Sequence, residues 1–358
     1  MVIGQLITGE EICHYNNSIV VKFSGRRKVI SNSPVNGGKR DDLTAVFNND
    51  CTNGTAIDAS GYARYISHLS CDLSLDPNTT AGMITAAQME NASIKTVSYK
   101  DISVTAIVTG SIETNGGRVG DPASWDELIN KKYIEQGTIN IMLFINTNLT
   151  DGALTRAITT CTEAKTAALQ ELLAPSRYSR GLATGSGTDS VIIVCNSESH
   201  ITLTDTGNHV KLGECIGKVI ITSVKEALDL QSGLNPQRQH DVLRRMSRFG
   251  ITSETLWNAL NESNPSKINK AQFTVALMML KNDDSLVTGT SLYAHLLDQI
   301  TWGLISLPEA INYIELLLNK MNMGALSKIN NDQNPVDYLI SEFKRGFLKL
   351  LFDKIGSD

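Results

Sequence analysis

The chain lacks the signatures that usually identify a metal, a nucleic acid or a membrane as a ligand. Its six cysteines and six histidines are scattered without C-x-x-C or H-E-x-x-H spacing, so we expect no metal site and no resident cofactor. The net charge is −5 and basic runs are short, which argues against a nucleic-acid partner. The longest apolar segment, residues 139–145, is too short to cross a membrane, and the N-terminal residues do not resemble a secretory signal. We therefore expect no membrane partner and a cytoplasmic location.

Composition changes near residue 235. All six cysteines and most glycines precede this point, whereas the remainder has helical spacing throughout and no chemical motif. We predict two domains, residues 1–235 and 236–358, and an α+β fold class. The first domain is expected to hold a mixed β-sheet with long helices packed on one face. The second is expected to be all-helical and to serve in packing, in a homo-oligomer or in binding a protein partner.

Hydrophobic periodicity predicts the elements. The first domain should contain strands at 18–23, 28–31, 43–47, 81–87, 94–99, 103–111, 138–146 and 191–195. The segment 138–146 is nearly all apolar, so it should be buried on both faces. Helices are expected at 59–69, from Thr150 or Asp151 to 173, and at 209–230. In the second domain we predict helices at 241–249, 253–260, 270–280, 291–300, 308–321 and 336–354.

A run of glycines and hydroxyls at residues 181–190 leads directly into an apolar, largely β-branched strand. The run fits neither a phosphate-binding P-loop, nor a dinucleotide fingerprint, nor a serine nucleophile elbow. Glycines let backbone N–H groups approach a ligand, and Asp189 adds a charge that suits a base or an orienting group. A tight structural turn is the alternative.

Four further segments, residues 32–38, 82–87, 108–121 and 204–209, also place amides, hydroxyls or glycines at the ends of strands or helices. Such ends are where open sheets bind ligands. Together the segments predict one large polar cavity. Its expected substrate-binding residues are Asn36, Gly37, Gly38, Thr85, Thr109, Asp121, Thr184, Gly185, Ser186, Gly187 and Thr188.

Several short motifs within these segments and between them resemble the adenosylcobinamide amidohydrolase family, in family order, over about residues 15–232. The matching pieces are NGG at 36–38, MITAA at 83–87, VTG at 108–110, RVGD at 118–121, GTINI at 137–141, LTDGA at 149–153, EAKTAAL at 163–169, ATGSGTD at 183–189 and HVKLGE at 209–214. The chain departs from the family at Gly110-Ser111, where alanine and glycine are more usual, and at Ser186, where threonine is usual.

The resemblance implies hydrolysis of the amide that joins the aminopropanol arm of adenosylcobinamide to the corrin ring. The products would be adenosylcobyric acid and 1-amino-2-propanol, and the cobalt would arrive with the corrinoid substrate. A non-catalytic corrinoid-binding or trafficking protein is the second hypothesis. A third is a self-processing amidohydrolase that uses a threonine exposed by cleavage at Gly187-Thr188.

Amide hydrolysis requires a nucleophile, stabilisation of an oxyanion and a proton for the leaving amine. We predict Asp189 and His209 as candidate bases and Lys165 as a proton donor or a ligand for a corrin carboxamide. Backbone N–H groups of residues 185–188 are the expected oxyanion hole, and Gly213 should leave space above His209. The structural alternatives are His209 packing at a helix start, Lys165 on the surface, Asp121 capping a turn and Asn36 bonding its own turn.

Overall fold

The computed structural model describes residues 1–52, 61–123, 126, 128, 137–263, 268–328 and 333–356. The chain divides into two compact units, Met1–Asn235 and Pro236–Asp358. The N-terminal unit is built on two β-sheets and the C-terminal unit is helical, so the predicted α+β class is confirmed. In the described residues no helix is long and apolar enough to span a membrane.

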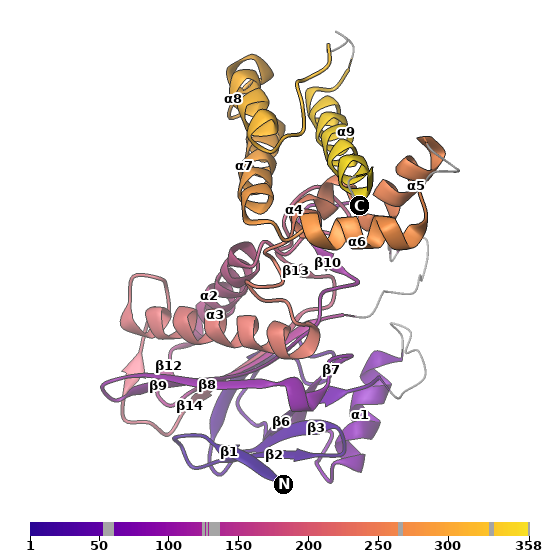
Figure 1. Ribbon diagram of the computed structural model, residues 1–358. Helices are drawn as coiled ribbons and strands as arrows, with labels where there is room; N and C mark the ends of the chain where they lie inside the picture. Colours follow the sequence, from indigo (N-terminus) through magenta and orange to yellow (C-terminus); the bar gives the residue numbers. More distant parts are fainter. Residues whose placement is uncertain are drawn as a thin grey trace. The chain divides into compact units, whose positions relative to one another are not determined.

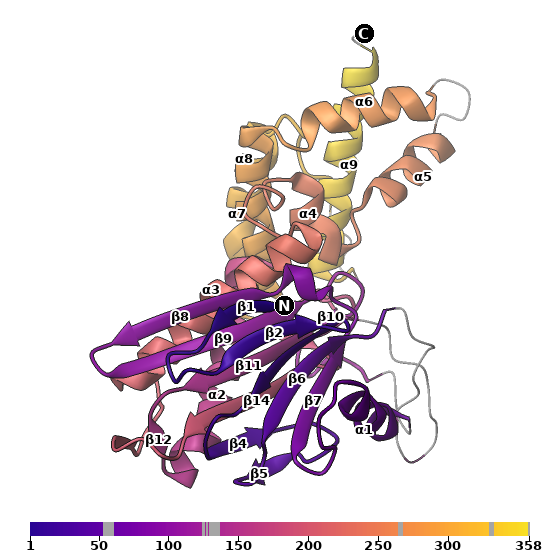
Figure 2. The same ribbon diagram turned by 90° about the horizontal axis from the view of Figure 1, so that it is seen from below.

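Two mixed sheets pack face to face in the N-terminal unit (Figures 1 and 2). The five-stranded sheet has the order β1 (Val2–Gln5), β2 (Glu11–Tyr15), β3 (Ser18–Lys22), β6 (Ala45–Asp50), β7 (Thr80–Thr85), and only β6 and β7 pair in parallel. The six-stranded sheet has the order β5 (Gly38–Arg40), β4 (Arg27–Ser31), β14 (Ser190–Asn196), β11 (Ile139–Ile145), β9 (Ile102–Gly110), β8 (Ser93–Tyr99). In that sheet only β11 and β14 are parallel.

Strand β11 is buried on both faces, as its apolar sequence predicts. Ile139, Ile141 and Leu143 belong to the core beneath the helices, whereas Met142 and Phe144 belong to the core between the sheets. This two-residue alternation follows from the strand period. It places the polar side chain of the strand's second residue, Asn140, on the side of the other sheet.

Helices α2 (Asp151–Glu171) and α3 (Lys211–Ser232) cover the outer face of the six-stranded sheet, as predicted (Figure 1). The Thr150 hydroxyl caps α2 by accepting the N–H of Ala153, and Gly233, with φ of 66°, ends α3 in the left-handed conformation. Leu230, where the predicted helix was expected to end, lies on the surface within α3. Helix α1 (Tyr62–Asp72) packs through Ile66 on the outer face of the five-stranded sheet.

Short pieces complete the unit: β10 (Gly116–Gly117) pairs with β13 (Gly185–Ser186), and β12 (Asn148–Leu149) pairs with β15 (Thr202–Leu203). A 3₁₀ turn spans Met89–Asn91. The sequence did not indicate β1 and β2, because both are short and only partly buried. The predicted start of the first helix, residues 59–60, lies outside the described residues.

The C-terminal unit contains α4 (Val242–Met246), α5 (Ser253–Ser263), α6 (Lys270–Leu280), α7 (Asp284–Thr301), α8 (Leu307–Lys320) and α9 (Pro335–Gly356), with a 3₁₀ turn at Ser247–Phe249. Its core is rich in aromatic side chains, among them Phe273, Tyr293, Phe343 and Phe347. Helix α7 begins well before the predicted residue 291, because the Asp283 side chain caps it by accepting the N–H of Leu286.

Candidate functional site

Four of the five predicted polar segments meet at one edge of the six-stranded sheet. This edge holds the starts of the parallel strands β11 and β14 and the end of the antiparallel strand β9. The glycine loop precedes β14, and its β13 pairs with β10 in the segment 108–121. Asn32 donates to the carbonyl of Asp189 at 3.1 Å, and Asn140 donates to the carbonyl of Ile84 at 3.0 Å. The segments 32–38 and 82–87 therefore reach the same edge.

An ion pair between Lys165 and Asp189 lies at the centre of this edge. The Lys165 side chain of α2 is 10% exposed and that of Asp189 is 11% exposed, so the surface alternative for Lys165 is wrong. Asp189 Oδ1 accepts the N–H of Ile139 at 2.8 Å and the hydroxyl of Ser186 at 2.7 Å. Asp189 Oδ2 accepts the N–H of Ser186 at 3.0 Å. The carboxylate thus connects helix α2, strand β11 and the glycine loop.

Gly185 has no side chain because the ion pair occupies the space where one would lie. A Cβ on this residue would overlap Oδ2 of Asp189 and lie 2.6 Å from Nζ of Lys165. Even alanine would therefore force the charged pair away from the loop backbone. By contrast, Gly187 is exposed and a Cβ there would meet nothing within 4 Å. The first glycine shapes the charged site, and the second leaves its outer side open.

The backbone of the glycine loop offers fewer free donors than expected. The N–H of Ser186 is bound to Asp189, and the N–H of Thr188 donates to Ser186 Oγ at 3.2 Å. Thr188 Oγ1 donates to the carbonyl of Gly137 at 2.7 Å. An oxyanion hole made from all four N–H groups of residues 185–188 is thus not available in this conformation. The ammonium of Lys165 supplies a positive charge beside the loop.

A buried polar chain extends from the glycine loop into the space between the sheets. Thr138 Oγ1 donates to the carbonyl of Thr188 at 2.7 Å and lies 3.3 Å from Asn140 Oδ1. Asn140 donates to Asn48 Oδ1 at 2.7 Å, and Asn48 donates to Thr109 Oγ1 at 2.8 Å. All these side chains except Thr188 are at most 3% exposed. Of the four, the sequence predicted only Thr109.

Thr85, Asn36, Gly37 and Gly38 serve local structure in this conformation. Thr85 Oγ1 accepts the N–H of Ala87 at 3.0 Å, and the threonine is buried. Asn36 donates to two backbone carbonyls of residues 77 and 80 at the start of β7, while Thr85 ends that strand. A Cβ on Gly37 would overlap the carbonyl of Ser33, and Gly38 has φ of 77°. Asn36 thus ties its turn to the segment that leads into β7, rather than bonding its own turn as the structural alternative expects.

Asp121 and Thr184 join the loop after β10 to the glycine loop. Asp121 Oδ2 accepts the N–H of Arg118 at 2.8 Å and the hydroxyl of Ser176 at 2.6 Å. Burial raises the pKa of Asp121, but hydrogen bonds from Ser176 and Ser179 and the positive Arg118 hold it below its usual value. Thr184 Oγ1 accepts the N–H of residue 119 at 2.9 Å. Asp121 therefore caps a turn beside the site.

His209 lies between β15 and α3, and its neighbour Asn208 donates to Glu163 Oε2 of α2 at 3.1 Å. Two residues after His209, the ammonium of Lys211 lies 5.1 Å from the ring of Tyr99, which is paired with the first residue of β9. Asp189 instead contacts Ile139, which is paired with the last residue of β9. At roughly 3.3 Å per residue, about 25 Å of strand separates the two ends. In the described residues no hydrogen bond or ion pair joins His209 to Asp189 or Lys165.

The prediction that Gly213 leaves space above His209 is wrong. A Cβ on Gly213 would overlap the backbone of Gly207 and lie 2.6 Å from the carbonyl oxygen of Thr206. The missing side chain thus permits close packing of α3 against the preceding loop. Helix α3 begins at Lys211, after Val210 as its N-cap, so His209 lies outside the helix.

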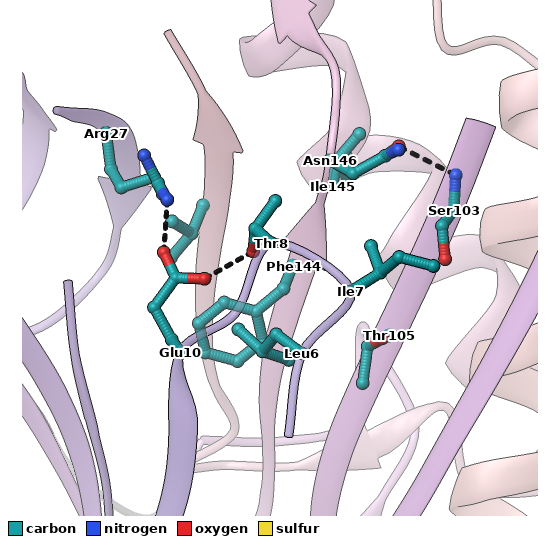
Figure 3. A pocket seen from close by; sticks show the side chains of 11 residues that line it. Leu6, Ile7, Thr8, Glu10, Arg27, Ser103, Thr105, Phe144, Ile145 and Asn146 are labelled. Atoms are coloured by element: carbon teal, nitrogen blue, oxygen red, sulfur yellow. Dashed lines mark hydrogen bonds and ion pairs between the residues drawn. The ribbon is translucent and has the colours of Figure 1, made fainter. Parts of the chain in front are cut away.

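A pocket between the two sheets lies away from the predicted site (Figure 3). It contains about 280 Å³ of space, open solvent at its mouth included, which is below the usual range for small-molecule sites. A buried ion pair between Glu10 and Arg27 lies at one side. No predicted site residue lines it; its lining residues are Leu6, Ile7, Thr8, Glu10, Arg27, Ser103, Thr105, Phe144, Ile145, Asn146 and Val194.

Comparison with known proteins shows that the N-terminal unit is similar to one protein family. The sequence pattern of the family described as adenosylcobinamide amidohydrolase matches residues 3–236. An uncharacterized protein of Methanocaldococcus jannaschii is 33% identical over 223 residues, which cover 59% of this chain and 85% of that protein. A Pyrococcus horikoshii OT3 protein of known crystal structure aligns with a TM-score of 0.33 and 12% identity, over 70% of this chain and 89% of the other.

Proposed function

We propose, because this chain belongs to the adenosylcobinamide amidohydrolase family, that it cleaves the amide between the aminopropanol arm and the corrin ring of adenosylcobinamide. The products are adenosylcobyric acid and 1-amino-2-propanol, and the cobalt enters as part of the substrate. The family match carries this proposal, since it spans the N-terminal unit and includes the whole polar edge. We further propose that the reaction occurs in the cytoplasm as a step of corrinoid salvage.

The chemistry of the polar edge supports an amide-cleaving site there. Lys165 supplies a positive charge beside the exposed end of the glycine loop, where a developing oxyanion needs stabilisation. Asp189 holds the Lys165 ammonium in place and also accepts a hydrogen bond from the hydroxyl of Ser186 in the loop. A corrin ring is fringed with carboxamides, which pair with backbone and hydroxyl groups rather than with many charges. The hydroxyl-rich loops at this edge provide such partners.

The direct test is release of 1-amino-2-propanol from adenosylcobinamide by the full-length chain. The expected result is steady release that depends on enzyme concentration and falls at least about a hundredfold in Lys165→Met. Ser327→Ala, which alters a hydroxyl–carboxylate contact in the C-terminal unit, is the matched control and should retain activity. Absence of amine release by folded wild-type protein would refute the proposed reaction.

Two other functions make different predictions. The first is a corrinoid carrier. The ion pair between Lys165 and Asp189 is compatible with this function, because a rigid binding surface needs side chains that are held in place by such contacts. Such a carrier would bind adenosylcobinamide without turnover. A self-processing enzyme would be cut between Gly187 and Thr188, the first of which is exposed. An intact mass equal to that of the uncut chain in active protein would exclude self-processing.

A further inference from the structure

We propose that the hydroxyl of Ser186 is the nucleophile that attacks the scissile amide, a role that rests on the proposed function above. Its Oγ lies 2.7 Å from Asp189 Oδ1 and accepts the N–H of Thr188 at 3.2 Å. The side chain is partly exposed and precedes the open position at Gly187. Ser186 therefore combines a carboxylate partner with access from outside.

The other predicted hydroxyls lack this combination. Thr188 Oγ1 donates to the carbonyl of Gly137, which is not a base. Thr85 and Thr109 are at most 3% exposed, so a macrocyclic substrate does not reach them. Thr184 accepts a backbone N–H, and no carboxylate is found as its partner in the described residues. Of these five hydroxyls, only that of Ser186 donates to a carboxylate.

The ion pair can accept the proton of the attacking hydroxyl and stabilise the negative charge that forms on the substrate. As Ser186 Oγ bonds to the amide carbon, its proton passes to Asp189 Oδ1, and the negative charge of the carboxylate moves to the former carbonyl oxygen. Lys165 then faces that oxyanion in place of the neutralised acid, so the cluster keeps its charge balance. The proton next passes to the departing nitrogen, the C–N bond breaks, and 1-amino-2-propanol leaves.

The ester on Ser186 is then cleaved by water. Water bonds to the acyl carbon and gives a proton to Asp189 Oδ1, which returns it to Ser186 Oγ as the C–O bond breaks. Adenosylcobyric acid is released and the hydroxyl is restored. Gly185 is a positioning residue in this scheme, because only a residue without Cβ lets Lys165 and Asp189 lie against the loop.

The test compares three variants of Ser186 in the full-length chain. Ser186→Ala should lower kcat at least about a thousandfold, as loss of a nucleophile does, while substrate still binds. Ser186→Thr keeps a hydroxyl and should retain kcat within about tenfold. Ser186→Cys should lose its activity on treatment with iodoacetamide, with substrate protecting it, whereas wild-type activity should persist although the chain holds six free cysteines. Ser93→Ala, which removes a hydroxyl donor to Glu226, is the matched control and should leave kcat unchanged.

The outcomes separate this assignment from the proposed function. If the wild type releases the amine and folded Ser186→Ala keeps more than about one hundredth of its kcat, the nucleophile is not Ser186 but the reaction stands. Should Ser186→Ala fail to fold, iodoacetamide inactivation of an active Ser186→Cys variant supports the assignment, and resistance of that variant overturns it. An inactive wild type would refute the reaction itself.

Discussion

The two units use buried polar groups in different ways. In the C-terminal unit such groups secure helices: Asp241 caps α4 by accepting two N–H groups, and Glu342 of α9 accepts the N–H and hydroxyl of Ser327. In the N-terminal unit Glu10 and Arg27 form a separate buried pair, but several other buried polar groups converge on the glycine loop, where Lys165, Asp189 and the chain from Asn48 meet. The first pattern satisfies a helix end and fastens a loop to a helix. The second joins groups from α2, β6 and β11 at one loop, within the residues that the family pattern matches.

The largest expected effect is on amine release, and it compares glycine-to-alanine substitutions, each of which adds one methyl group, in the two units. Gly185→Ala should reduce amine release at least about a hundredfold, because the Cβ displaces the ion pair by contact with both charged groups. Gly289→Ala in α7 meets the flexible side chain of Met321 and should lower stability without lowering kcat. Gly217→Ala in α3 meets nothing and should be neutral or slightly stabilising. Steady-state kinetics with thermal unfolding checks all three. Equal kcat in Gly185→Ala and Gly289→Ala would contradict the proposed difference between the two units.

The next effect concerns the charge of Lys165. Lys165→Met should lower the free energy of unfolding by about 3–5 kcal/mol, because the buried Asp189 carboxylate loses its counter-charge. The double variant Lys165→Met/Asp189→Asn should recover part of this loss. Removing the exposed partner in Lys225→Met, which pairs with Glu171, should cost less than about 1 kcal/mol. Denaturant unfolding measures these values, and a Lys165 effect as small as that of Lys225 would contradict the buried pair.

The buried amides provide a third contrast. Asn140→Leu leaves Asn48 Oδ1 without its donor and should cost about 1–3 kcal/mol. The double variant Asn48→Leu/Asn140→Leu should recover stability but not kcat, since Thr138 and Thr188 would still lose their alignment. Thr290→Val in the C-terminal unit replaces a fully buried hydroxyl and should preserve kcat. Recovery of kcat together with stability in the double variant would show that the amides serve folding alone.

The smallest effect is an acid dependence in the C-terminal unit. Burial raises the pKa of Glu342, but Arg345 and Ser327 together hold it below its usual value. A carboxyl with a lowered pKa in the folded state stabilises above its ordinary pKa and loses that contribution as pH falls through the folded value. Glu342→Gln should therefore cost about 1–2 kcal/mol at pH 7 and less at pH 4. Glu254→Gln, on the surface, is the control. The test measures the free energy of unfolding of wild type and variant at both pH values. A difference between them that does not change with pH would refute the link between the ionisation of Glu342 and stability.

Much of the fold follows from local pattern. The alternation in β11 and the cap of α2 at Thr150 depend on neighbouring residues, so the sequence predicts both. Strands β1 and β2 have no strong apolar pattern, because β1 forms the sheet edge and both strands are only partly buried. In the C-terminal unit, the start of α7 depended on recognising Asp283 as a cap rather than as part of a loop.

The candidate site could be predicted from the sequence only in part, because its residues come together from distant positions in the chain. Asn48 and Asn140 are 92 residues apart, and neither is unusual within its own segment. Lys165 did carry a signal, since it lies four residues after buried Cys161 and three before buried Ala168 on the same stripe of α2.

The most direct measurement is the product balance of the full-length chain with adenosylcobinamide, followed by liquid chromatography and mass spectrometry. We expect one adenosylcobyric acid and one 1-amino-2-propanol for each substrate consumed, with both products lost together in Gly185→Ala. Folded wild-type protein that binds adenosylcobinamide and returns it intact would contradict an amide-cleaving site at the edge where Lys165, Asp189 and Ser186 meet.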